Sequence, residues 1–238
     1  MWRQLIEDNQ DFEMFSVMHF IPVFIMAVGG YLIIRKGLSF QNREDKLKLA
    51  FLWSLPGPVL ILGWMLFRYY TGTFSKDDDI PVHLCNFVTV IIPFYFLHPD
   101  RKLFGILYFW VMVGTFQALL TPSLEQGFPH FWYFRYWIIH CGLIILILYA
   151  IIVLGERPGW ADFKRAFIAT NIYAIFTLLV NFTIDSNYFF TMKKPETASL
   201  LDYLGPWPWY LVTGQLVMGI MFTLYLLPFT LVKQQSAG

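Results

Sequence analysis

Charged residues are scarce in this chain of 238 residues. Asp, Glu, Lys and Arg together make up 14% of it, and hydrophobic residues make up 57%. A soluble domain has about 25% charged residues, so this chain has too few to cover its surface in water. Its net charge of +1 also lacks the basic excess expected of a nucleic-acid-binding protein. We therefore predict an all-α, polytopic membrane protein that lies in a lipid bilayer and binds no nucleic acid.

Disulfides, a cleaved leader and nucleotide-binding loops are also not indicated. Cys85 and Cys141 are the two cysteines, and both lie within apolar runs, which favours free thiols. The first 15 residues carry one Arg against four acids and have no small-residue cleavage site, so we expect no signal-peptide cleavage. A phosphate-cradling glycine loop is absent from the sequence. No cofactor and no metal are expected.

Long apolar runs, in contrast, are abundant. A membrane-spanning helix needs roughly 20 apolar residues, and isolated strands cannot satisfy their backbone in lipid. On that measure residues 1–238 form one domain of seven transmembrane helices. The predicted spans lie near residues 14–34, 47–70, 81–98, 102–120, 132–154, 163–184 and 207–231.

Lys and Arg are distributed unequally between the two sides of these spans. Eleven of the 17 lie in the first, third and fifth loops and the C-terminal tail, and at most six lie on the other side. Because cytoplasmic loops carry the excess of basic residues, we predict that the N-terminus is outside and the C-terminus is cytoplasmic.

Polar residues gather in the outer halves of the predicted spans. If Pro81 begins the third helix, Cys85 lies about one turn inside it, near backbone N–H groups without helical partners. His140 lies about 12 Å deep in the fifth span. The other polar residues expected around an outer-leaflet cavity are His83, Gln117, Asn181, Asp185, Asn187 and Tyr188. Polar residues inside a membrane usually mark a site.

A cysteine nucleophile needs a nearby base. His83 is two residues from Cys85 and therefore about 200° around a helix, so it faces elsewhere. His140, on another helix, is the better base. Asn181 or Asp185 is expected to orient its imidazole, by analogy with catalytic triads.

Structural roles compete with this interpretation. Cys141, beside Gly142, is expected to pack as a small hydrophobe, and His19 to serve the core. Asn181 and Asp185 are alternatively helix-joining hydrogen-bonding residues. Surface or membrane-interface positions are expected for His98, His130, Arg68 and Arg135.

Four segments carry a family resemblance. They are PVHLCN at 81–86, QALLTP at 117–122, FPHFWYFRYWIIHCGL at 128–143 and NYFFTMKKPETASLLDYLGPWPWYL at 187–211. In these segments, and in the same order over almost the whole chain, the sequence resembles the YwaF family, or transmembrane protein 164 family, of integral membrane acyltransferases.

This resemblance implies a seven-helix enzyme in which a cysteine takes a fatty acyl group as a thioester and passes it to a lysophospholipid. Carried over by position, the nucleophile is Cys85 and the assisting histidine, expected to act as general base, is His140. Residues near the mouth of the site are then Asn187, Tyr188, Lys194 and Pro195. The compact chain is typical of a bacterial member in the cytoplasmic membrane.

The expected substrate is a membrane phospholipid or lysophospholipid. Its phosphate is expected to bind the cations Arg68, Arg135, Lys193 and Lys194. One alternative is a lipid-binding or transport protein without covalent chemistry. The other is a metal-dependent lipid hydrolase, whose ligands would be His83, Cys85, His140 and Asp185.

Overall fold

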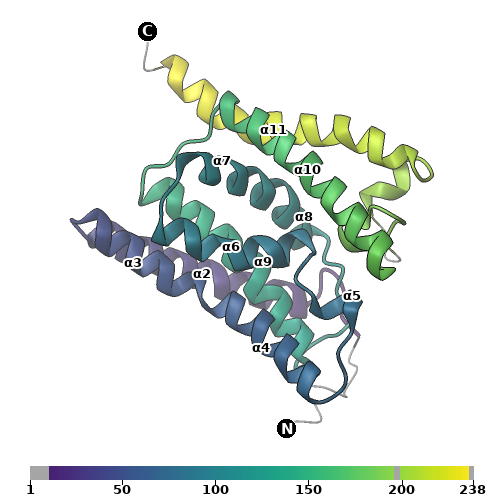
Figure 1. Ribbon diagram of the computed structural model, residues 1–238. Helices are drawn as coiled ribbons and strands as arrows, with labels where there is room; N and C mark the ends of the chain where they lie inside the picture. Colours follow the sequence, from purple (N-terminus) through teal and green to yellow (C-terminus); the bar gives the residue numbers. More distant parts are fainter. Residues whose placement is uncertain (1–10, 196–198, 236–238) are drawn as a thin grey trace.

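The computed structural model describes residues 11–195 and 199–235, and within them every regular element is a helix. Figure 1 shows the arrangement. The long and short α-helices are α2 (Val17–Ser39), α3 (Arg43–Ser54), α4 (Pro56–Tyr70), α5 (Lys76–Asp79), α6 (Leu84–Leu97), α7 (Arg101–Phe109), α8 (Phe116–Leu120), α9 (Phe131–Ile152), α10 (Trp160–Ile184) and α11 (Trp209–Gln235). A π-helical segment, η1 (Trp110–Thr115), joins α7 to α8, and the 3₁₀ segments η2 (Tyr188–Phe190) and η3 (Leu200–Leu204) lie between α10 and α11.

Six helical segments in the described residues are long and apolar enough to cross a membrane. They are Val17–Ser39, Arg43–Tyr70, Arg101–Leu120, Phe131–Ile152, Trp160–Ile184 and Trp209–Leu231. The predicted third span, 81–98, is a shorter apolar helix, Leu84–Leu97. Its 14 residues extend over about 21 Å, whereas a bilayer core is about 30 Å thick. The chain is an integral membrane protein, and the part of it that the structure describes contains six helices of spanning length and one shorter apolar helix.

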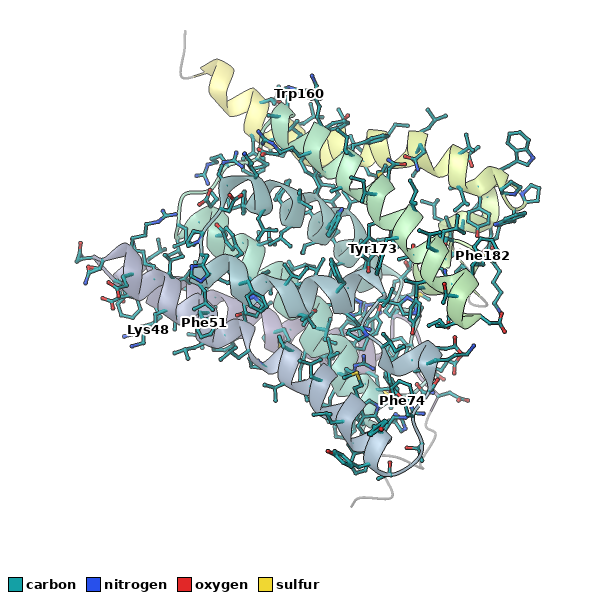
Figure 2. All side chains as sticks on the ribbon, in the orientation of Figure 1. Lys48, Phe51, Phe74, Trp160, Tyr173 and Phe182 are labelled. Atoms are coloured by element: carbon teal, nitrogen blue, oxygen red, sulfur yellow. The ribbon has the colours of Figure 1, made fainter. Side chains whose placement is uncertain are left out.

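Helix α9 occupies the centre of the bundle (Figure 1). Apolar side chains occur on all sides of α9, and residues such as Trp137, Leu143 and Tyr149 are buried. Helices α2, α3 and α4 form one flank, and α10 and α11 form the other, with α6 and α7 between. Figure 2 shows Tyr173 of α10 pointing into the interior and Phe182 at the periphery, in agreement with exposures of 5% and 65%. Large exposed side chains such as Phe182 form the lipid-facing surface.

Hydrogen bonds and ion pairs join loops at each of the two ends of the bundle. At one end, Arg43 donates to the Leu154 carbonyl and pairs with Glu156, at 3.3 Å in each case. At the other end, the Phe12 amide donates to the Glu125 carbonyl at 2.8 Å, and Lys76 donates to the Ile184 carbonyl. The α2–α3 connection therefore lies beside the α9–α10 connection, the N-terminal segment beside the α8–α9 connection, and α5 beside the end of α10.

The segment Arg43–Tyr70 is broken at Leu55, between α3 and α4. Pro56 begins the new helix, and Pro58 has no N–H to donate to the Ser54 carbonyl. The Ser54 hydroxyl turns back to the Phe51 carbonyl at 2.6 Å. This break leaves room beside α6 and α9.

Candidate active site at the start of α6

Cys85 is the second residue of α6. The helix begins at Leu84 rather than at Pro81, because residues 80–83 form a turn in which the Val82 amide donates to the Ile80 carbonyl at 2.8 Å. The first helical hydrogen bond runs from the Phe87 amide to the His83 carbonyl at 2.9 Å. The amide of Cys85 thus has no acceptor within the helix and lies at the positive end of the helix dipole.

Thr115 is the nearest polar partner of the Cys85 thiol. The distance between Cys85 Sγ and Thr115 Oγ1 is 3.8 Å. Thr115 is the last residue of η1 and is 1% exposed. A π-helical turn contains one extra residue and is frequent at functional sites. Sequence reasoning missed Thr115, because it had identified Gln117 as the polar residue of this span and no composition signal reveals the extra residue.

His140 has one ring nitrogen occupied and one available. Its Nδ1 lies 2.7 Å from the Tyr136 carbonyl oxygen. A carbonyl only accepts, so Nδ1 must carry the proton, and Nε2 of the neutral ring then holds a lone pair. Within the described part of the chain, no hydrogen bond occupies Nε2. The tautomer is therefore the one that a general base requires.

Tyr136 packs directly against His140. Its ring stacks on the His140 ring with centroids 4.0 Å apart, and its hydroxyl donates to the Ala118 carbonyl at 2.7 Å. The phenol also lies within electrostatic range of the Cys85 thiol. No direct hydrogen bond between Cys85 and His140 is found among residues 11–195 and 199–235. Their catalytic pairing stays a prediction.

Asn181 and Asp185 do not orient His140 in this structure, contrary to the expectation. Asn181 is buried; its Oδ1 accepts from the Tyr188 amide at 2.8 Å, and its Nδ2 donates to the Tyr188 carbonyl and to Thr191 Oγ1. Asp185 ends α10 in the left-handed conformation at φ 53° and is exposed. The backbone carbonyl of Tyr136 takes the orienting role instead, since the residue four positions earlier in the helix is already in place.

Of the four remaining predicted lining residues, Asn187 and Tyr188 belong to the loop between α10 and α11. The His83 and Tyr188 rings pack in a T-shaped arrangement with their centroids 5.1 Å apart. Asn187 closes the loop by donating to the Lys193 carbonyl at 2.9 Å, and Gln117 is exposed on α8.

Tyr188 anchors the same loop to α5. It is 1% exposed, and its hydroxyl donates to the Lys76 carbonyl. Burial, and then the carboxylates of residues 77–79, disfavour the phenolate and raise the pKa of Tyr188 to about 12. Tyr188 is therefore a neutral hydrogen-bond donor at physiological pH.

The four predicted headgroup cations have different surroundings. Arg68 pairs with Asp79 at 3.1 Å and donates to the Thr73 carbonyl at 2.8 Å. Lys193 is exposed, and Lys194 reaches the Asp202 carbonyl at 3.4 Å.

Arg135, in contrast, is 4% exposed, and its Nε is buried without a hydrogen-bond partner. In the described residues no carboxylate lies within 4.0 Å of it. Its guanidinium lies 4.5 Å from the centre of the Trp132 ring. A buried cation without a paired anion is costly, so Arg135 is the best placed of the four to receive a phosphate.

The metal-site alternative, His19 and Cys141 can each be compared with the structure. Groups of three or more His, Cys, Asp and Glu residues able to hold a metal are not found in the described residues, so the ligand set of the hydrolase alternative is not assembled. His19 uses both ring nitrogens: Nδ1 accepts from the Phe15 amide at 3.2 Å, and Nε2 donates to the Leu119 carbonyl at 2.9 Å. Cys141 is 4% exposed and packs with Tyr133 and Trp137.

Comparison with known proteins identifies the family of this bundle. The sequence profile of the TMEM164 family matches residues 14–226, which include both Cys85 and His140. An uncharacterized protein of Treponema pallidum (strain Nichols) is 25% identical over 170 residues, covering 71% of this chain and 70% of that protein. No solved structure matches the chain. Because the matched region covers well over half of the chain, the chain belongs to the TMEM164 family.

Proposed function

We propose that this protein is a membrane acyltransferase that moves a fatty acyl group between phospholipids through a thioester on Cys85. The observation that supports it most is the tautomer of His140, which leaves Nε2 as a free acceptor. A cysteine nucleophile requires such a base. Family membership agrees with the proposal, since the resemblance by motif implies this activity.

In the first step, His140 Nε2 takes the proton of the Cys85 thiol, and the sulfur attacks the ester carbonyl of a donor phospholipid. The carbon–sulfur bond forms and the ester carbon–oxygen bond breaks. The leaving lysophospholipid oxygen receives the proton from His140. The products are a lysophospholipid and an acyl-Cys85 thioester.

In the second step, the hydroxyl of an acceptor lysophospholipid gives its proton to His140 and attacks the thioester carbonyl. The new ester bond forms, the carbon–sulfur bond breaks, and the proton returns to the Cys85 sulfur. No water or oxidant is consumed. In both steps the backbone N–H groups of the first turn of α6 are available to stabilise the oxyanion.

The substrate phosphate is proposed to bind Arg135. This residue precedes His140 by five positions on α9, about 7.5 Å along the helix axis. Because five positions are also about 140° around a helix, the lipid is proposed to reach across this arc, with its phosphate at Arg135 and an ester linkage at His140. Arg68 is proposed to act indirectly, since Asp79 already occupies it.

The finer topology is part of the same proposal. The helices are proposed to cross the membrane seven times, with α6 as the short third span, the N-terminus outside and the C-terminus cytoplasmic. The excess of basic residues in alternate loops supports this orientation. Cys85 then faces the outer leaflet of a bacterial cytoplasmic membrane.

Acyl trapping tests the proposed function. Protein in lipid nanodiscs is incubated with a phosphatidylcholine that carries an alkyne-tagged acyl chain, and the tag is then detected on the protein. We expect hydroxylamine-labile label on the wild type and on the Cys141→Ala control, and none on Cys85→Ala. Labile label that persists on Cys85→Ala, or its absence from the wild type, would contradict the proposal.

The break at Leu55 favours a second candidate, a lipid-binding or transport protein, because interrupted membrane helices often surround transported substrates. Movement of a fluorescent phospholipid across proteoliposomes is the measurement. A rate in Cys85→Ala equal to that of the wild type, together with no acylation of the wild type, supports this second function.

A further inference from the structure

A cavity of about 230 Å³ lies where α3 and α4 separate. Its wall comes from α2, the broken α3–α4 segment, α6 and α9. The lining residues are Met26, Trp53, Ser54, Pro56, Gly57, Thr89, Ile92, Ile138, Ile139, Gly142, Leu143, Ile145 and Leu146. We call this space the α4-break cavity.

The α4-break cavity adjoins the candidate active site on two helices. Thr89 lines it and donates its hydroxyl to the Cys85 carbonyl at 2.7 Å. Cys85, Thr89 and Ile92 follow the i, i+4, i+7 spacing of one helix face. On α9, the lining residue Leu143 lies one turn beyond His140, at the i, i+3 spacing. A group attached to the Cys85 sulfur can therefore continue along α6 into the cavity.

The two side-chain hydroxyls of the lining are both engaged in hydrogen bonds within the fold. The Ser54 hydroxyl donates to the Phe51 carbonyl and the Thr89 hydroxyl to the Cys85 carbonyl. The remaining side chains are almost all hydrocarbon or aromatic. Polar ligands bind where convergent polar groups are free to orient them, so this space suits a hydrocarbon chain.

The size of the cavity agrees with a chain rather than a whole lipid. Its lining on α9 extends from Ile138 to Leu146, about 12 Å along the helix axis. Sites for complete drug-sized ligands are roughly 300 to 1,000 Å³, which is more than the cavity offers. We infer that the α4-break cavity holds the fatty acyl chain while its carbonyl carbon is bonded to Cys85; this inference rests on the proposed function.

Gly142 gives a direct way to shorten the cavity. It lines the cavity, and a Cβ built on it meets nothing within 4 Å, so a larger side chain enters free space without a backbone clash. Leu is also a better helix former than Gly. Gly142→Leu should therefore fold normally and fill part of the space that the chain occupies.

The experiment measures chain-length preference. Wild type and Gly142→Leu are incubated in nanodiscs with alkyne-tagged phosphatidylcholines of 10, 14 and 18 carbons, and the initial rate of Cys85 labelling is compared. A misfit of one methylene in an apolar pocket changes discrimination roughly 10- to 200-fold. We expect the ratio of 18-carbon to 10-carbon labelling to fall at least tenfold in Gly142→Leu. An unchanged ratio would overturn the inference.

Gly63→Leu is the matched control. Gly63 is a helical glycine of α4 that also has nothing within 4 Å of a built Cβ, and it does not line the cavity. Its chain-length ratio should equal that of the wild type. A tenfold fall in this variant as well would show a general effect on the bilayer-facing surface and would overturn the inference.

Photocrosslinking separates failure of the inference from failure of the proposed function. Nanodiscs contain a phosphatidylcholine with a diazirine near the end of one acyl chain, and crosslinked peptides are mapped. Crosslinks at Ile92 or Leu146 that disappear in Gly142→Leu support a bound chain, whether or not Cys85 is acylated. Cys85 acylation without such crosslinks retains the proposed function and rejects the cavity as the chain site.

Discussion

Replacing Arg135 with Met should lower activity without lowering stability. The guanidinium is buried, and its Nε has no hydrogen-bond partner. The Asp79 carboxylate, which acts on Arg135 electrostatically, already forms an ion pair with Arg68. Met has a similar length and keeps an apolar contact with Trp132. The substitution therefore removes the charge with little change in packing.

The loss of activity follows from the phosphate contact proposed for Arg135. A hydrogen bond to a charged group contributes roughly 1.5 to 3 kcal/mol, which corresponds to roughly 10- to 150-fold in kcat/KM. Arg135→Lys keeps the charge but not the forked donor geometry, so its activity should lie between those of Met and the wild type. Initial rates of transfer to a short-chain lysophospholipid, measured over a range of concentrations, give kcat/KM.

Although Arg135→Met should lower activity, it should not lower the stability of the protein. Met loses a cation–π contact of roughly 0.5 to 2 kcal/mol but relieves the burial of an unpaired ion, which costs several kcal/mol. Arg135→Met should therefore have a Tm in detergent equal to or above that of the wild type. Arg68→Met is the control: it leaves the Asp79 carboxylate, whose side chain is 0% exposed, without its ion pair, and should cost roughly 3 kcal/mol.

Two results would refute this reasoning about Arg135. The first is a fall in Tm as large as that of Arg68→Met, which would assign Arg135 a structural role. The second is an unchanged kcat/KM in a folded Arg135→Met protein, which would remove the phosphate from this position.

Three further predictions concern the candidate site and the fold. Thr115→Val should reduce the rate of thioester formation about tenfold and Thr115→Ser much less, because only the hydroxyl contacts the thiol; equal rates in both variants would assign Thr115 to packing alone. Above pH 10, Tyr188 should contribute a loss of up to about 1.4 kcal/mol of unfolding free energy per pH unit toward pH 12, because folding keeps it protonated up to a pKa of about 12; thermal melting at each pH should show a shallower loss for Tyr188→Phe than for the wild type, by up to this amount. Gly105→Ala should lower the free energy of unfolding by roughly 1 to 3 kcal/mol, because its Cβ would lie 2.4 Å from Asp162 Oδ1. This should appear as a lower Tm, whereas Gly63→Ala should have no such effect.

The membrane helices were predictable because lipid imposes one requirement on all of them. A continuous apolar run of sufficient length must be helical, and the six helices of spanning length lie where such runs were identified. The start of α6 was less predictable. Pro81 fits the first turn of a helix as well as it fits a loop, and here it lies in the turn before Leu84.

The candidate residues Cys85 and His140 can be picked out from the sequence, but their contacts cannot. Cys85 and His140 stand out because reactive side chains are rare in apolar helices. Their partners do not, since His140 is oriented by a backbone carbonyl, a group that every residue carries. Thr115 reaches Cys85 through a π-helical turn, and the register shift that this turn produces has no counterpart in residue composition.

Hydrogen-bonding capacity separates structural polar residues from functional candidates better than depth in the membrane does. Asn181 and His19 are both buried, and each uses its donor and its acceptor within the fold. Their energetic role is complete without a ligand, because burial of a polar group is offset once it is paired. His140 Nε2 and Arg135 Nε have no such partner in the described residues. A polar atom without a hydrogen-bond partner is costly in an apolar interior. A substrate whose hydroxyl gives a proton to His140 Nε2 and whose phosphate binds Arg135 explains the presence of both side chains.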